Sequence, residues 1–179
     1  MKNDIKEVYY SAEELQDVVK RLGREISEYY KDKNLLLVSI LKGSVVFMAD
    51  LMRAIDIPCR IDFMAVSSYG SGTKTSGIVK VQKDLDINLE GYDLLLVEDI
   101  LDSGKTLFYV REMLKTRNPA SIRICTLFDK PDRREADIHA DYKGVDVPDE
   151  FIVGYGLDYD EKYRNLPYIG VLKPEVYEK

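Results

Sequence analysis

The segment from Leu94 to Thr106 constrains the fold more than any other part of this chain. Its sequence, LLLVEDILDSGKT, places four apolar residues before two adjacent carboxylates and a short polar turn. A short apolar run of this kind is typical of a buried strand. After the turn, Leu107, Val110 and Leu114 recur at helical spacing. The pattern predicts a strand, an acidic turn and a helix, which is the repeating unit of α/β sheets.

The polar turn has the groups needed to hold a sugar phosphate together with a metal ion. In open α/β sheets, ligands bind just outside the carboxyl ends of the strands, and backbone N–H groups at the start of a helix attract phosphate. Glu98, Asp99 and Asp102 bring three carboxylates to that place. The alternative is a solvated acidic turn that caps the helix. Capping explains Ser103, with Asp102 as a second candidate cap, but it does not explain two adjacent carboxylates at the end of a strand.

Two familiar motifs do not fit this segment. Gly104-Lys105-Thr106 matches the end of a P-loop, but that motif requires a glycine five positions before Gly104, where this chain has Asp99. An acidic pair after an apolar strand also occurs in phospho-receiver domains, where it follows the first strand. Here more than ninety residues precede the pair, so both assignments are rejected.

The rest of the chain alternates predicted helices and strands. Ser11 and Glu14 have the spacing of a capping box before an amphipathic helix that reaches Ile26. A second helix is predicted over 45–55, and strands are predicted over 35–40, 60–66, 78–83, 122–128, 151–155 and 167–172. Such alternation predicts one α/β domain over residues 1–179, with a mostly parallel sheet covered by helices on both faces.

Composition excludes several classes of protein. The formal net charge of −6 argues against nucleic acid as the main partner. No apolar run reaches the length of a membrane span, and the polar N-terminus does not resemble a signal peptide, so we expect a cytoplasmic protein. Cys59 and Cys125 are expected to be reduced core residues. His139, the single histidine, lies in a polar segment, which argues against a zinc site or a Ser-His-Asp hydrolase.

The segment from Leu94 to Thr106 resembles the phosphoribosyl-diphosphate signature of the type I phosphoribosyltransferases. Within that family the chain is similar to the hypoxanthine-guanine phosphoribosyltransferases. Four further segments carry the resemblance, in the family's order: LKG at 41–43, SSYG at 67–70, DKP at 129–131 and FIVGYGLD at 151–158. The resemblance implies a central, mostly parallel sheet with helices on both faces, a small hood and a flexible lid loop.

The resemblance also implies an activity. Members of this family transfer the 5-phosphoribosyl group of 5-phosphoribosyl 1-diphosphate to hypoxanthine or guanine, with Mg²⁺ as cofactor. The expected partners are therefore these small molecules and further copies of the chain, in a dimer or tetramer, with no nucleic acid and no membrane. One alternative is a related transferase that prefers xanthine. The other is a nucleotide-sensing regulatory protein that binds RNA, which the negative charge and the intact Asp102 disfavour.

By resemblance, one side of the site binds the phosphoribosyl group and the diphosphate. Asp102 is the expected general base for the purine N7 proton, and Glu98 and Asp99 face the ribose hydroxyls or Mg²⁺. The residues expected to wrap the 5′-phosphate are Ser103, Gly104, Lys105 and Thr106. Those expected to hold the diphosphate are Lys42 and Gly43, in a loop with a non-proline cis peptide bond, and Arg164.

The other side is expected to bind the purine base. By resemblance, Lys130 donates to the 6-oxo group, Phe151 stacks on the base and Ile152 contacts it through its backbone. Asp158 is expected near the purine 2-position and a second Mg²⁺. From the residues alone, a lone lysine such as Lys130 is more often a solvated surface charge, and a core aromatic that opens a strand explains Phe151 nearly as well.

The segment 67–77 is rich in Ser, Gly and Thr and poor in apolar groups. This composition predicts a mobile hairpin tip, or a lid that excludes water during the reaction. The resemblance identifies Ser68 and Tyr69 as lid residues.

Overall fold

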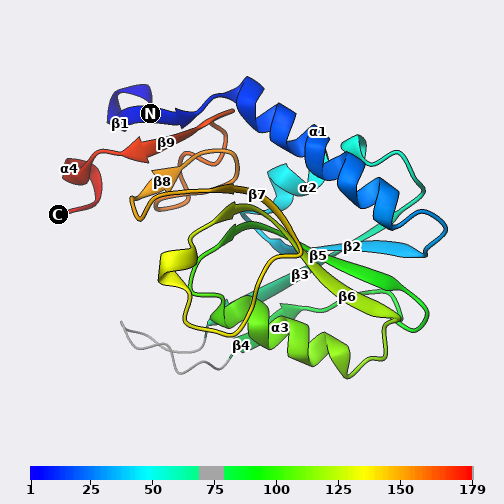
Figure 1. Ribbon diagram of the computed structural model, residues 1–179. Coiled ribbons are helices and arrows are strands. Elements are labelled where there is room, and N and C mark those ends of the chain that lie inside the picture. Colours follow the sequence, from blue (N-terminus) through cyan, green and yellow to red (C-terminus); the bar gives the residue numbers. More distant parts are fainter. Residues whose placement is uncertain (69–78, 179) are drawn as a thin grey trace.

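A six-stranded sheet forms the centre of the molecule (Figure 1). The computed structural model describes residues 1–68 and 79–178. The strand order is β4-β3-β2-β5-β6-β7, and every neighbouring pair is parallel except β3 and β4. The strands are β2 (Leu35–Leu41), β3 (Arg60–Ser68), β4 (Val79–Lys83), β5 (Asp93–Leu101), β6 (Ser121–Asp129) and β7 (Tyr142–Asp146).

Helices cover both faces of this sheet, as predicted. Helices α1 (Ala12–Tyr29) and α2 (Val45–Ala54) pack on one face and α3 (Lys105–Lys115) on the other. Alternate residues of β2 enter the two layers: Leu35 and Leu37 join the cluster with α1 and α2, whereas Leu36 and Val38 join the cluster with α3. Burial on both faces explains why the central strands are continuously apolar in sequence.

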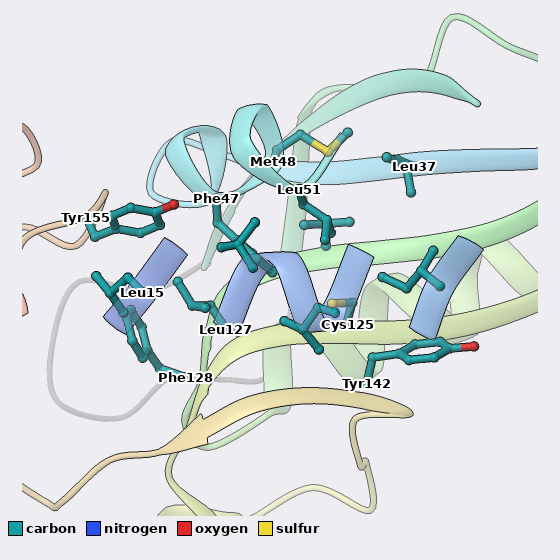
Figure 2. Packing of buried hydrophobic residues seen from close by; sticks show 14 of the residues in the cluster. Leu15, Leu37, Phe47, Met48, Leu51, Cys125, Leu127, Phe128, Tyr142 and Tyr155 are labelled. Atoms are coloured by element: carbon teal, nitrogen blue, oxygen red, sulfur yellow. The ribbon is translucent and has the colours of Figure 1, made fainter. Parts of the chain in front are cut away.

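The amphipathic helix α1 begins at the predicted capping box. The Glu14 N–H donates to Ser11 Oγ at 3.2 Å, and the Ser11 N–H donates to Glu14 Oε2 at 2.8 Å. Its buried face meets α2 and the sheet in a cluster that contains Leu15, Phe47 and Cys125 (Figure 2). Cys125 is therefore a buried free thiol, as predicted.

A second, antiparallel sheet of three strands forms the hood. Its order is β1 (Ile5–Tyr10), β9 (Ile169–Leu172) and β8 (Ile152–Val153), so it joins both ends of the chain. It lies beyond the carboxyl ends of β5 and β6 (Figure 1). The described chain ends in the short helix α4 (Pro174–Tyr177).

The sequence interpretation missed two strands and overextended a third. β1 and β7 were not predicted because β1 is mostly exposed and its apolar residues do not alternate with polar ones, and because β7 is a half-exposed edge strand. The predicted strand 151–155 is paired only at Ile152 and Val153. It ends there because Gly154 and Tyr155 have positive φ angles of 104° and 48°, which turn the chain.

Candidate active site

A cleft of about 690 Å³ opens between the carboxyl edge of the large sheet and the hood. Its walls come from the ends of β5 and β6, the segment leading into β8, the loop after β8, and α4. The lining residues are Gly43, Asp99, Ile100, Asp102, Lys130, Arg133, Asp149, Glu150, Phe151, Ile152, Leu157, Asp158, Arg164 and Tyr177. A second cavity of about 160 Å³ shares Ile100 and Asp102 with it and is also lined by Glu98, Ser103, Gly104 and Thr106.

The smaller cavity lies at the start of α3. Gly104 is the N-cap residue of this helix, with a φ angle of 79°. An added Cβ there would lie 2.5 Å from Ile138 Cγ2, so glycine is needed for both conformation and space. The N-cap residue Gly104 has no side chain to cap the helix, but the Lys105 N–H donates to Ser103 Oγ at 3.5 Å. Ser103 therefore contributes to the helix start, as the capping interpretation expected. The free N–H groups of a first helical turn favour an anion at such a cavity.

Arg134 fixes the turn that carries Asp102. Its guanidinium donates to the carbonyl oxygens of Leu101 at 3.2 Å, Asp102 at 3.0 Å and Ile138 at 2.8 Å. It also pairs with the carboxylate of Asp129. These four partners use most of its donors, so Arg134 acts on the backbone of the turn and not as a free cation.

Glu98 and Asp99 form an acidic pair at the end of β5, in which Asp99 is buried and Glu98 is partly buried. Glu98 Oε1 is buried and has no hydrogen-bond partner among the described residues. Burial and the neighbouring charge of Asp99 hold the pKa of Glu98 well above its ordinary value. Burial also raises the pKa of Asp99 to about 6, although the Ile100 N–H donates to its Oδ1 at 2.8 Å. A cation or a hydroxyl donor that binds beside such a pair stabilises its charged form.

Asp102 is linked to the base side of the cleft through Arg133. The Nε of Arg133 lies 2.9 Å from Asp102 Oδ1, and its Nη1 lies 2.9 Å from Asp149 Oδ1. Arg133 therefore spans from the acidic turn to the segment that precedes Phe151. Both of its carboxylate partners line the main cleft.

Gly43 brings the predicted diphosphate loop against the acidic pair. The peptide bond between Leu41 and Lys42 is cis, as the resemblance implied. A Cβ added to Gly43 would lie 2.0 Å from Asp99 Oδ2, and one added to Gly156 would lie 2.0 Å from the Gly43 carbonyl oxygen. Glycine at both positions is thus required for three segments to meet at this point.

One carboxylate pairs with both cations of the predicted diphosphate site. Glu161 Oε2 lies 3.1 Å from Lys42 Nζ, and Glu161 Oε1 lies 3.1 Å from Arg164 Nη2. Arg164 also lies 2.9 Å from Asp158 Oδ1 and donates to the Gly156 carbonyl at 2.8 Å. Lys42 and Arg164, far apart in sequence, are in this way brought to one carboxylate.

The base side contains a buried lysine and an exposed aromatic ring. Lys130 is only 8% exposed, and its Nζ donates to the Glu150 carbonyl at 2.9 Å. Burial lowers the pKa of Lys130, an effect opposed by the charges of Asp102 and Asp149. Phe151 is 38% exposed and lines the cleft. These positions exclude both the surface-charge explanation of Lys130 and the core-aromatic explanation of Phe151.

Most predicted site residues meet in the two cavities, but some do not line them. The Lys105 ammonium pairs with Glu135 and lies outside the lining of the smaller cavity. The Lys42 side chain contacts Glu161, and only its neighbour Gly43 lines the main cleft. Ser68 is the last residue of β3, whereas Tyr69 and the rest of the predicted lid lie outside the described residues.

Several lining or supporting residues were not identified from the sequence, among them Arg133, Arg134, Asp149, Glu150, Glu161 and Tyr177. The two arginines lie two and three residues after the DKP segment, and this proximity is the only signal that could have found them. Asp149 and Tyr177 lie in segments that carry no motif.

Neither a metal-binding cluster nor a membrane-spanning helix is found in the part of the chain that the structure describes. Within residues 1–68 and 79–178, no group of three or more His, Cys, Asp or Glu side chains is arranged to hold a metal ion. Among the helices described, none is long and apolar enough to cross a membrane. A magnesium ion usually takes only one or two carboxylates and completes its shell with water and phosphate oxygens, so the first finding leaves room for one.

Known proteins with similar sequences decide the family. A model of the phosphoribosyl transferase domain matches residues 7–160. The chain is 57% identical over 178 residues to a hypoxanthine-guanine phosphoribosyltransferase of Bacillus subtilis (strain 168), covering 99% of both chains. It is 55% identical over 179 residues to that of Streptococcus thermophilus (strain CNRZ 1066), covering 100% of this chain and 99% of the relative. The chain belongs to the hypoxanthine-guanine phosphoribosyltransferase family.

The fold is that of the same phosphoribosyltransferase family. A crystal structure of a hypoxanthine phosphoribosyltransferase from Staphylococcus aureus superposes with a TM-score of 0.98 at 53% identity, covering 100% of this chain and 97% of the other. The expected type I phosphoribosyltransferase fold, with its mostly parallel sheet and hood, is therefore confirmed.

Proposed function

We propose that the protein transfers the 5-phosphoribosyl group from 5-phosphoribosyl 1-diphosphate to hypoxanthine or guanine, forming IMP or GMP and diphosphate. The observation that carries this proposal is a pair of cavities that share Ile100 and Asp102. The smaller one is lined by Glu98 and the phosphate-binding turn, and the larger one by Asp99, a buried lysine and an exposed aromatic ring. The sequence relatives with this name support the same activity.

On the phosphoribosyl side, the first turn of α3 binds the 5′-phosphate. The backbone from Ser103 to Thr106 supplies N–H donors, and the hydroxyl groups of Ser103 and Thr106 lie at the same cavity. Glu98 and Asp99 accept hydrogen bonds from the ribose hydroxyls, which satisfies the free oxygen of Glu98. The acidic pair thereby gains the partners that it lacks among the described residues.

The same carboxylates fit Mg²⁺. A hard cation with oxygen ligands suits two adjacent carboxylates whose pKa values are raised by burial. Glu98 and Asp99 would hold one ion, and Asp158, beside Arg164, would hold a second. When bound, Mg²⁺ neutralises negative charge on the leaving diphosphate.

On the base side, Lys130 selects 6-oxopurines. Its ammonium already donates to the Glu150 carbonyl and has further N–H groups for the 6-oxo oxygen. Phe151 stacks on the base, the backbone of Ile152 contacts it, and Asp158 lies near its 2-position. All four residues line the main cleft, which supports this assignment.

The reaction depends on positioning and on stabilising charge. Asp102 accepts the purine N7 proton as the bond to the ribose forms. The backbone at Gly43 and the cations of Lys42 and Arg164 stabilise the departing diphosphate. Arg164 reaches the cleft directly, and Lys42 shares a carboxylate with it.

Family membership also supports two expectations about where the protein acts and how it assembles. We infer that the protein acts in the cytoplasm and assembles as a homodimer or homotetramer. Sedimentation at several protein concentrations tests the assembly, and a monomer at all of them would contradict it. A related transferase that prefers xanthine remains the second candidate, because the same lysine can donate to its 6-oxo group.

One assay tests the proposed function. Purified protein is incubated with 5-phosphoribosyl 1-diphosphate, Mg²⁺ and one of four radiolabelled purines: hypoxanthine, guanine, xanthine or adenine. We expect nucleotide from hypoxanthine and guanine and little from adenine. Faster turnover of xanthine would support the second candidate, and no nucleotide from any base would contradict the proposal.

A further inference from the structure

The C-terminal turn of the chain lies on the ring that is proposed to hold the base. Tyr177, in α4, stacks on Phe151 with ring centroids 4.9 Å apart and an interplanar angle of 22°. Tyr159 meets Phe151 from another direction, at 5.5 Å and 89°. Two tyrosines therefore contact a phenylalanine that is still 38% exposed and that lines the cleft.

The position of Tyr177 is set by the hood. The Leu172 N–H donates to the Phe151 carbonyl at 2.8 Å, five residues before Tyr177. The Lys173 N–H donates to the Asp4 carbonyl at 2.9 Å. Val176 and Tyr177 then pack against the buried cluster under the hood. Backbone bonds and apolar contacts thus place the tyrosine where its ring can meet Phe151.

A half-exposed phenylalanine needs such support in order to bind a flat ligand well. Without contacts on its ring, Phe151 would populate several rotamers, and the base would have to fix one of them on binding. Offset stacking holds the ring in one plane before the ligand arrives. Tyr177 also lines the cleft itself, so Phe151 and the tyrosine that stacks on it belong to the same wall of the cleft.

We propose that Tyr177 is a positioning residue for the base site, which orients the ring of Phe151 for stacking on the purine. This inference rests on the proposed function, in which Phe151 contacts the base. It assigns the last turn of the chain a role in base and nucleotide binding. The phosphoribosyl side is held separately, by the bonds of Arg134, so its affinity is independent of Tyr177.

The test compares steady-state kinetics of Tyr177→Ala, Tyr177→Phe and the wild type. In Tyr177→Ala we expect the KM for hypoxanthine and the Kd for GMP to rise about 2- to 12-fold, the usual worth of one aromatic pair. The KM for 5-phosphoribosyl 1-diphosphate should change less than about twofold. Tyr177→Phe keeps the stacking ring and should restore wild-type values. Val176→Ala, on the same turn, controls for general loosening of α4.

Phe151→Ala separates failure of this inference from failure of the proposed function. If Phe151→Ala leaves the KM for hypoxanthine unchanged, the base does not stack on Phe151 and the assigned base site is wrong. If Phe151→Ala raises that KM and Tyr177→Ala does not, only the role of Tyr177 is overturned. A lower KM in Tyr177→Ala would also overturn it, because the tyrosine ring would then occupy the place of the base. If Tyr177→Ala raises the KM for hypoxanthine and the KM for 5-phosphoribosyl 1-diphosphate equally, Tyr177 has a structural role alone. The same conclusion follows if Val176→Ala raises the KM for hypoxanthine as much as Tyr177→Ala does.

Discussion

The two sides of the cleft differ in how their charged groups are satisfied. On the phosphoribosyl side, Glu98 and Asp99 lie next to each other with raised pKa values, and one oxygen of Glu98 has no partner among the described residues. On the base side, Lys130 is bonded to Glu150 and Phe151 is supported by two tyrosines. Without a ligand, the acidic pair of the phosphoribosyl side lowers the stability of the folded protein. On the base side, Lys130 and Phe151 already have their partners.

The difference indicates two ways of gaining affinity. The two adjacent carboxyl groups lower the free energy of unfolding of the ligand-free protein. A cation or hydroxyl donor that binds the acidic pair removes this destabilisation, so binding and stability are coupled there. A base that enters the other side meets groups that are already oriented, so little has to be reordered. Substitutions on the two sides should therefore separate effects on stability from effects on base choice.

Asp102 lies where the two sides meet, and its loss should have the largest effect. Asp102→Asn keeps the shape of the side chain and removes the proton acceptor, so kcat should fall by about 10²- to 10⁴-fold. The affinity for 5-phosphoribosyl 1-diphosphate should be kept. Single-turnover kinetics and a binding titration measure the two quantities.

Asp149→Asn is the matched control, because Asp149 shares Arg133 with Asp102 and is a more exposed carboxylate of the same cleft. Its kcat should stay within about threefold of the wild type, about 0.65 kcal/mol in activation free energy. An Asp102→Asn variant with the same small change would remove Asp102 from the chemistry.

The phosphoribosyl side could be predicted from the sequence because it is nearly continuous. Strand β5, the acidic turn and α3 follow one another, and the topology of α/β sheets places such a turn at the ligand edge. Only the groups assigned to the diphosphate, Lys42 and Gly43 after β2 and Arg164 after β8, come from other parts of the chain. What the residues did not reveal is the packing around the turn: Arg134, thirty-two residues after Asp102, binds its backbone.

The base side could not be predicted from the residues alone because it is assembled from distant segments. Lys130 follows β6, Phe151 precedes β8 and Tyr177 ends the described helix α4. Only the hood brings them together, and β1 of the hood is a mostly exposed strand without the alternation of apolar and polar residues that periodicity detects. The resemblance supplied Lys130 and Phe151, but it gave no role for Tyr177.

Lys130→Ala should have the second largest effect and should be confined to the base. Hydrogen bonds of charged groups are worth about 1.5–3 kcal/mol, so kcat/KM for hypoxanthine and guanine should fall by about 10- to 150-fold. Adenine offers no 6-oxo acceptor and should lose less, so its kcat/KM relative to hypoxanthine should rise. This ratio does not depend on the amount of folded enzyme.

Lys115→Ala serves as the control, since Lys115 is an exposed lysine of α3 that pairs with Glu112. Lys115→Ala should leave kcat/KM unchanged for hypoxanthine and for adenine. An unchanged ratio of adenine to hypoxanthine in Lys130→Ala would mean that base choice is made elsewhere in the cleft.

Asp99→Asn should stabilise the ligand-free protein by about 1–3 kcal/mol near pH 7. The folded-state pKa of Asp99 is raised to about 6, above its ordinary value of 3.8. The folded state therefore binds the proton more tightly, and the wild type loses stability as pH rises from about 4 to about 6. Thermal melts across this range should show the variant's advantage growing up to pH 6 and then levelling off.

Ligand should reverse this order, which connects the effect to function. With saturating Mg²⁺ and 5-phosphoribosyl 1-diphosphate, the wild type should gain more stability than Asp99→Asn. Asp158→Asn is the contrast, because Asp158 is already paired with Arg164 and its removal should not stabilise the ligand-free form. A variant at Asp99 that melts well below the wild type without ligand would show that the acidic pair is structural.

Glu161→Gln should give the smallest effect and should act on diphosphate alone. Glu161 pairs with Lys42 and Arg164, the two cations assigned to diphosphate, so the incoming anion has to displace its carboxylate. Exposed ion pairs are weak and screened by salt. We therefore expect the Kd for diphosphate to fall by about 2- to 5-fold at low ionic strength, with the gain shrinking as salt is added. Asp160→Asn removes the same charge one residue away, from a pair with Lys162, and should change the Kd less. Weaker binding in Glu161→Gln would instead mean that the carboxylate orients the two cations for the ligand, and the diphosphate site would then be prearranged in the same way as the base side.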